Sequence, residues 1–129
     1  MHELSITYEL VQIAHAAAVN AGATRVNVVH LRLGVMAGVV KDSLLFGYDI
    51  ATEGTLLEGS RLVVIDVPVI LHCPTCNQDS QIDDIQMFIC PHCGTPTADL
   101  RQGREIEIES IEITTEEDTH EPTAAFTGN

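Results

Sequence analysis

The chain contains little positive charge. Six lysines and arginines stand against nineteen aspartates and glutamates in 129 residues, which gives a formal net charge of −13. Proteins that bind nucleic acid neutralise its phosphates with clustered Lys and Arg. Only Arg101 and Arg104 lie near the cysteine-containing segment described below. We therefore expect no nucleic-acid partner.

Long apolar runs are also absent. The longest apolar stretch, residues 62–71, is interrupted by Asp66 and Pro68 and is far too short to span a bilayer. The chain starts Met1-His2-Glu3 and lacks the basic segment and apolar run of a secretory leader. We expect a cytoplasmic protein with no membrane association.

No catalytic constellation is recognisable. None of the serines lies in the Gly-x-Ser-x-Gly context of a nucleophile elbow, and there is no glycine-rich phosphate-binding loop. We therefore expect a protein that is not an enzyme.

The most informative residues are the four cysteines, which form two matched pairs. They stand in Cys73-Pro74-Thr75-Cys76 and Cys90-Pro91-His92-Cys93, close to the spacing of a tetrahedral zinc site. Each second cysteine precedes a residue that tolerates positive φ, Asn77 or Gly94. Such a backbone lets the N–H groups of the turn point back at the sulfurs. The pattern predicts that Cys73, Cys76, Cys90 and Cys93 hold zinc, or iron in its place.

Other uses of the cysteines are disulfides, redox chemistry and electron transfer. Two disulfides would need an oxidising compartment, whereas we expect a cytoplasmic protein. A thioredoxin-like dithiol opens a helix, whereas Pro91 and Gly94 indicate a ribbon turn. Rubredoxin-like electron carriers use the same Cys-Pro-x-Cys-Gly turn, so this function stays open as an alternative. A zinc-ribbon scaffold that only joins other molecules is a second alternative.

Hydrophobic periodicity predicts two helices and three strands. The helices are expected over residues 4–20 and 42–53, and the strands over 25–33, 61–71 and 104–113. The expected apolar stripe of the first helix is Leu10, Ile13, Ala14, Ala17 and Ala18. Pro68 suggests that the strand over 61–71 lies at a sheet edge, where it could also pair with a second copy of the chain.

The last strand indicates how the chain is organised. A bulge near Ser110 would place Ile106, Ile108, Ile111 and Ile113 on one face. Because these isoleucines need an apolar partner surface, we expect the strand to return to the sheet of the first half. The cysteine module, residues 71–103, would then be an insertion in a domain made of residues 1–70 and 104–115. We expect residues 116–129 to be a disordered acidic tail.

The amino terminus is a second candidate metal site. A terminal amine, a backbone amide nitrogen and an imidazole at position 2 can chelate one ion in nearly planar geometry, which suits Ni(II) or Cu(II) better than Zn(II). From the residues alone, His2 could equally be an ordinary frayed terminal residue.

Several motifs together resemble the HypA/HybF family of hydrogenase maturation nickel metallochaperones. The resemblance covers about residues 1–113 and includes the paired cysteines. Its other motifs are Met1-His2-Glu3-Leu4 leading into a helix, Leu33-Gly34, Gly38-Val39-Val40, Leu44 and Phe46.

The resemblance implies a nickel carrier. Family members bind nickel through His2 and the backbone nitrogens of His2 and Glu3, sometimes with the amino group of Met1, and the Glu3 side chain is tied to delivery. The four cysteines would hold a structural zinc. The fold would be α+β, a small mixed sheet packed on two helices, with the zinc module projecting from it. The carrier would pass nickel to a nickel–iron hydrogenase large subunit precursor, with a maturation GTPase as partner.

The sequence departs from the family at one nickel ligand. Some members supply an acidic side chain from the loop before the second helix, where this chain has Val40, which cannot ligate. Asp42 could substitute, although it could instead be the N-cap of the helix. His72 and His92 adjoin the cysteine turns. They could contact the cysteine turns or solvent, or one of them could replace a thiolate when nickel or pH changes.

Overall fold

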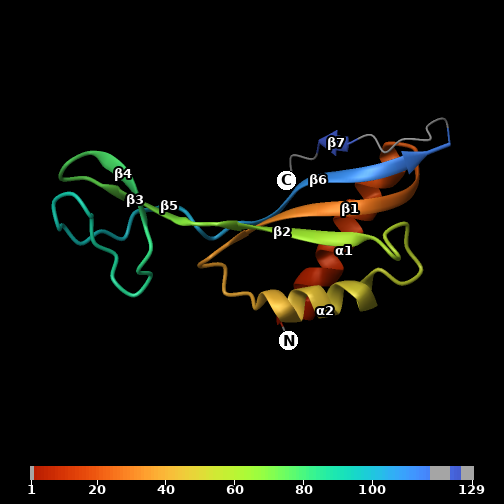
Figure 1. The fold of residues 1–129 in the computed structure, drawn as a ribbon, viewed down its shortest axis with the longest axis horizontal. Helices are drawn as coiled ribbons and strands as arrows, with labels where there is room; N and C mark the ends of the chain where they lie inside the picture. Colours follow the sequence, from red (N-terminus) through yellow and green to blue (C-terminus); the bar gives the residue numbers. More distant parts are fainter. Residues whose placement is uncertain (1, 117–122, 126–129) are drawn as a thin grey trace. The chain divides into compact units, whose positions relative to one another are not determined.

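The computed structural model describes the backbone of residues 2–116 and 123–125 and the side chains of residues 3–116. Two helices and two small sheets make up the fold, an α+β architecture as the sequence predicts (Figure 1). In chain order the elements are α1 (His2–Asn20), β1 (Ala23–Gly34), α2 (Lys41–Ala51), β2 (Arg61–Val67), β3 (Val69–Cys73), β4 (Gln78–Ile82), β5 (Leu100–Gln102), β6 (Ile106–Thr115) and β7 (Thr123–Ala125).

Contacts divide the chain into two compact units. The first consists of Met1–Leu31, Val39–Ile65 and Glu107–Asn129, and the second of Arg32–Gly38 and Asp66–Ile106. All four cysteines belong to the second unit. Within the described residues, neither helix is long and apolar enough to cross a membrane.

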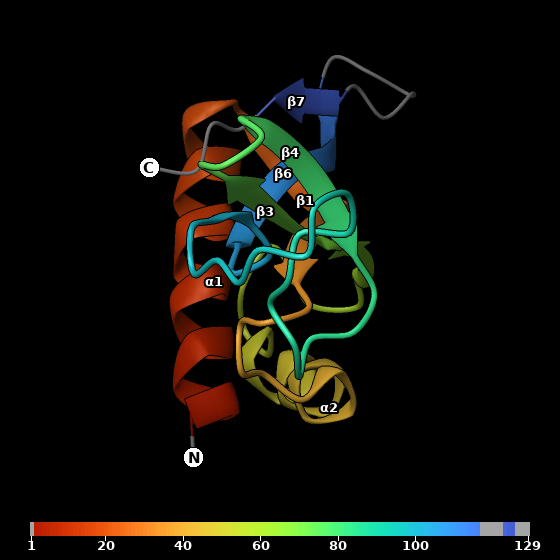
Figure 2. The ribbon, with the colours of Figure 1, turned by 90° about the vertical axis from the view of Figure 1, so that its left-hand side faces the viewer.

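The first unit is built on a four-stranded sheet with the order β2-β1-β6-β7. β1 and β2 run in the same direction and β6 runs opposite to them, so the sheet is mixed (Figure 1). Because parallel neighbours need a crossover, the chain passes through α2 between β1 and β2. α1 and α2 pack against each other (Figure 2). Buried side chains from both helices, β1 and β6 supply the core: Val11, Ala14, Ala18, Val26, Val29, Leu31, Leu44, Ile108, Ile111 and Ile113.

The predicted return of the last strand to the first sheet is confirmed, because β6 lies next to β1. Ile108, Ile111 and Ile113 are all buried, whereas Glu109 is exposed. Burial therefore shifts phase by one residue between Ile108 and Ile111, the pattern that a bulge near Ser110 would produce, while Ile106 is half-buried. On its other side β6 pairs with β7, with Ile111 opposite Ala124.

The strand predicted over residues 61–71 is in fact two strands. Pro68 separates β2 from β3, since proline has no N–H to donate to a ladder. β2 lies at the edge of the four-stranded sheet, as the proline suggested, but β3 is the central strand of the second sheet, β4-β3-β5. A single edge strand was therefore the wrong interpretation.

The second unit has its own small core. β3 pairs antiparallel with β4, with Val69 opposite Ile82 and Cys73 opposite Gln78, and antiparallel with β5 on its other side. The buried residues Val69, Leu71 and Ile82 form a cluster, against which Met36, Phe88 and Leu100 pack. Six residues of modest size make a limited core, so a further stabilising element is expected in this unit.

Two glycines meet in this unit at a close backbone approach. A Cβ atom on Gly34 would lie 2.2 Å from the carbonyl oxygen of Gly103, and Gly103 itself has φ of +130°. The Met36 N–H donates to the Gly103 carbonyl oxygen at 2.7 Å. Only glycine at position 34 allows this contact.

Candidate metal sites

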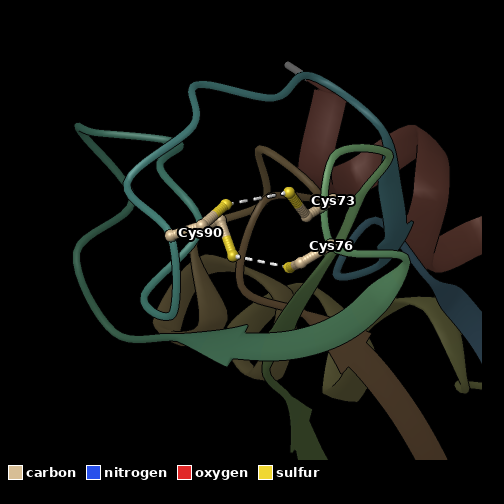
Figure 3. Close-up of side chains that lie close together, drawn as sticks. Cys73, Cys76 and Cys90 are labelled. Carbon is tan, nitrogen blue, oxygen red and sulfur yellow. Dashed lines mark hydrogen bonds between the residues drawn. The ribbon is translucent and has the colours of Figure 1, made fainter.

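The four cysteine sulfurs converge at one point. The ligand atoms of Cys73, Cys76, Cys90 and Cys93 all lie within 4.8 Å of one another. The Cys73 and Cys93 sulfurs are 3.4 Å apart and the Cys76 and Cys90 sulfurs 3.6 Å apart. In Figure 3, Cys73 and Cys76 point toward Cys90. Zinc–sulfur bonds of about 2.3 Å in a tetrahedron place sulfurs roughly 3.8 Å apart. The cluster therefore fits a tetrahedral metal ion.

The turns that hold the sulfurs have the backbone that the sequence predicts. Asn77 has φ of +55° and Gly94 has φ of +75°, and Asn77 is the one non-glycine residue with positive φ in the described chain. The Gly94 N–H donates to the Cys90 carbonyl oxygen at 2.9 Å, and the Cys90 N–H to the Thr95 carbonyl oxygen at 2.9 Å. These bonds close the second turn locally.

The cysteines are free thiols whose acidities differ strongly. The Cys76 backbone N–H lowers the pKa of Cys73 to about 6, despite the burial of Cys73. Burial raises the pKa of Cys76 to about 12, with hydrogen bonds to Cys90 and Cys73 next in importance. The Thr95 side chain, whose hydroxyl oxygen lies 3.1 Å from the Cys93 sulfur, lowers the pKa of Cys93. A divalent cation would favour the thiolate at all four positions.

The neighbouring histidines have different surroundings. His72 lies on β3 and its Nδ1 is 2.7 Å from the Asp79 carboxylate, while its backbone N–H donates to the Asp99 carbonyl oxygen at 2.9 Å. His92 is exposed. Neither histidine belongs to the group of converging ligand atoms among the described residues.

At the amino terminus the structure describes Glu3 but not Met1 or the side chain of His2, so those predicted nickel ligands lie outside the described residues. The Glu3 carboxylate accepts a hydrogen bond from the Val40 N–H at 3.3 Å. The Thr7 hydroxyl donates to the Glu3 carbonyl oxygen at 2.5 Å. These contacts hold Glu3 through both its side chain and its backbone.

Asp42 lies inside α2 and is not its N-cap, so that alternative is wrong. The N-cap is Val40, whose apolar side chain cannot accept a hydrogen bond from the first turn. Asp42 lies within that first turn. Glu3 and Asp42 line one pocket of about 320 Å³ together with Leu4, Ser43, Phe46, Gly47 and Ile50. The structure thus brings two carboxylates of the predicted nickel site, from residues far apart in sequence, to one cavity.

The sequence did not reveal Gly47, which lines this pocket, or Thr7, which lies beside Gly47. Thr7 is fully buried, and a Cβ atom on Gly47 would lie 3.4 Å from its hydroxyl. The buried stripe of α1 is Thr7, Val11, Ala14 and Ala18, whereas Ile13 is 42% exposed. The predicted stripe was rotated about the helix axis, because it left out both the polar Thr7 and the apolar Val11 and included Ile13. The positions i, i+4, i+7 and i+11 counted from Thr7 give the buried stripe.

Comparisons with known proteins cover most of the chain. Residues 1–113 match the family described as "Hydrogenase/urease nickel incorporation, metallochaperone, hypA". A "Hydrogenase maturation factor HypA" of Roseiflexus sp. (strain RS-1) is 50% identical over 125 residues, which is 97% of this chain and 100% of that relative. The protein of the same description from Chloroflexus aggregans is 46% identical over 112 residues, 87% of this chain and 98% of the relative.

Solved structures share the fold. The solution structure of the Ni metallochaperone HypA from Helicobacter pylori superposes with a TM-score of 0.66 at 21% identity, covering 88% of this chain and 98% of that one. A second solution structure, of a HypA protein, gives a TM-score of 0.67 at 22% identity, covering 90% and 98%. With the family match extending over residues 1–113 and relatives of 46% and 50% identity matched along nearly their full length, this chain belongs to the HypA family of nickel-incorporation metallochaperones.

Proposed function

We propose that this chain carries Ni(II) at its amino terminus and delivers it to a nickel–iron hydrogenase precursor during maturation, without catalysing a reaction itself. The observation that carries the proposal is the family match, which begins at the Met1-His2-Glu3 motif and continues through the cysteine pairs. The family description names nickel incorporation into hydrogenase and urease.

The amino-terminal site would combine nitrogen ligands. α1 begins at His2, and the first N–H groups of a helix have no acceptor within the helix. The backbone nitrogens of His2 and Glu3 would therefore be available to Ni(II), beside the His2 imidazole and the amino group of Met1. Because the Glu3 carboxylate accepts the Val40 N–H, its role would be to orient the first turn.

The fourth ligand is where this chain departs from its family. Val40 stands at the position of the acidic side chain that some members use. Asp42 is exposed and shares the pocket with Glu3. We propose Asp42 as the carboxylate that takes over this role.

The cysteine cluster would hold a structural zinc ion. Four thiolates within 4.8 Å of one another suit Zn(II), and a closed four-sulfur site leaves no open position for catalysis. Such a site contributes apparent binding energy on the order of 10–16 kcal/mol in small modules. That contribution would supplement the limited core of Val69, Leu71 and Ile82. Residues 71–103 would thus be the zinc-binding module, and residues 1–70 and 104–115 the nickel-binding domain.

The partners would be those of a maturation factor in the cytoplasm. We propose a maturation GTPase and the hydrogenase large subunit precursor, with no nucleic acid or membrane involved. β2 lies at a sheet edge, and pairing of β2 between two copies would produce a homodimer.

A nickel titration tests the carrier function. Zinc-loaded protein with its native Met1 and the same protein with a few extra residues before Met1 would be titrated by calorimetry. We expect about one equivalent of Ni(II) to bind only to the native terminus. A His2→Gln variant should lose this binding, and His92→Gln, at an exposed histidine of the cysteine module, should keep it. Equal binding by both termini would move the site to His72, His92 and the cysteines, and no binding by either would refute the proposal.

A further inference from the structure

The outward face of α2 carries an unusual stripe of side chains. Asp42, Phe46, Asp49 and Ile50, called here the α2 stripe, follow one another at helical spacing and are all exposed. Phe46 is 72% exposed, more than any other large apolar side chain in the described residues, and Ile50 is 42% exposed. The opposite face of the helix contains the buried residues Leu44, Gly47, Tyr48 and Ala51. The exposed apolar residues are therefore not needed for packing within this chain.

A pocket lies beside the α2 stripe. Phe46 and Ile50 line it from α2, and Leu4 lines it from α1. Gly47 also lines it, at a point where α1 and α2 approach closely: a Cβ atom on Gly47 would lie 3.4 Å from the Leu4 side chain. Its volume of about 320 Å³ is at the lower end of ligand sites. That size suits one large apolar side chain of a partner better than a cofactor.

The charge around the pocket indicates what kind of partner fits. Asp42 lies at one end of the α2 stripe and Asp49 near the other, both exposed. A second copy of this chain docked face to face at this surface would place its own Asp42 and Asp49 against these carboxylates, and the like charges would repel each other. A protein surface that presents an apolar side chain flanked by Lys or Arg would match both the pocket and the carboxylates.

We propose that the α2 stripe and its pocket are the docking surface for the nickel acceptor, the hydrogenase large subunit precursor. This proposal rests on the carrier function proposed above. The pocket contains Glu3 and Asp42, so a protein docked there has its own ligands beside the nickel that it receives. An apolar side chain of the precursor enters between Leu4 and Phe46, and a basic residue meets the exposed Asp49, while Asp42 remains with the nickel. Docking then positions the two proteins for exchange of nickel ligands one at a time.

The test uses matched apolar variants of the zinc-loaded full chain. Phe46→Ser and Ile50→Ser remove apolar side chains of the α2 stripe, and Ile13→Ser is the control. Ile13 is 42% exposed, the same as Ile50, but lies on α1 beside a different hollow lined by Glu9, Gln12 and Ala16. Affinity for the purified precursor is measured by calorimetry. Phe46→Ser should weaken binding by about tenfold or more and Ile50→Ser by roughly threefold or more, as truncation of interface anchors does. Ile13→Ser should stay within about twofold.

A charge variant tests the electrostatic part of the proposal. Asp49→Lys should weaken binding of the precursor, and high salt should reduce the difference from wild type. The control is Glu9→Lys, an equally drastic charge reversal at an exposed position of α1, which should have little effect. Circular dichroism and zinc content of each variant show that it is folded.

The outcomes separate this proposal from the carrier function. The docking surface is overturned if Ile13→Ser and Phe46→Ser weaken binding equally, if neither weakens it, or if only binding of the maturation GTPase changes. A nickel titration of the same proteins reports on the carrier function alone. Wild-type protein that binds the precursor through the α2 stripe but binds no Ni(II) would refute the carrier function and leave the docking surface standing.

Discussion

The N-cap of α2 offers a prediction that can be worked out from the structure. Val40 occupies this position with φ of −83° and ψ of +117°, the extended backbone that N-cap residues adopt, yet valine has no oxygen to accept an N–H. Val40→Asn should supply that acceptor to the first turn of the helix. An asparagine cap contributes about 1 kcal/mol relative to alanine.

The appropriate reference is Val40→Ala. Val40 is 58% exposed, so either substitution removes the same modest covered surface of the valine, roughly 0.6–1.3 kcal/mol of the 1.5–3 kcal/mol for a fully buried valine. The difference between the two variants therefore isolates the cap. It should be about 1 kcal/mol in favour of asparagine, or roughly 4 °C in Tm for a domain of this size.

Urea unfolding followed by tyrosine fluorescence measures the difference. The chain has two tyrosines and no tryptophan, and Tyr8 and Tyr48 both belong to the first unit. If Val40→Asn is no more stable than Val40→Ala, the reasoning is refuted, because Glu3 would then already satisfy the first turn.

Val40→Asp should gain less stability than Val40→Asn, since its charge is near the Glu3 carboxylate that accepts the Val40 N–H. It should nevertheless bind Ni(II) more tightly than wild type, because it restores the acidic ligand of the family.

Three further predictions concern the cysteines and the core. Cys90→Ser should reduce the zinc content well below one equivalent by mass spectrometry of metals and lower the midpoint of thermal unfolding of the second unit by circular dichroism, because that unit has only a small core; full retention of zinc would contradict this. In metal-free protein at pH 7, iodoacetamide should modify Cys93 before Cys76. Cys93 is exposed and its pKa is lowered by Thr95, which favours the reactive thiolate, whereas burial raises the pKa of Cys76 to about 12 and keeps it protonated. Peptide mapping with time gives the order, and a faster Cys76 would be the opposite result. Leu44→Ala should lower the free energy of unfolding by about 2–5 kcal/mol in the tyrosine assay, because Leu44 is completely buried; a loss below about 1 kcal/mol would show that the core can close around the cavity.

Local patterns explain why some features were predictable. The conformation of a Cys-x-x-Cys turn depends on a few adjacent residues. The sequence therefore already indicated the convergence of four sulfurs and the positive φ at Asn77 and Gly94. The return of β6 to the first sheet followed from the need to bury its isoleucines. The structure of residues 61–71 was harder to predict. Its alternation continues through Pro68, and only the missing N–H of that residue separates β2 from β3.

The sequence by itself determined the α+β class, the cysteine cluster and the family, because each depends on residue types at short, regular spacings. Tertiary structure alone decided the arrangement around the amino terminus. Glu3 and Asp42 meet in one pocket because α1 and α2 pack against each other, and Gly34 meets Gly103 across a long stretch of chain. Such contacts depend on how whole elements pack, which no local pattern contains. The exposure of Phe46 is the same kind of property: its helix and its apolar character are readable in the sequence, but only packing shows that it faces outward.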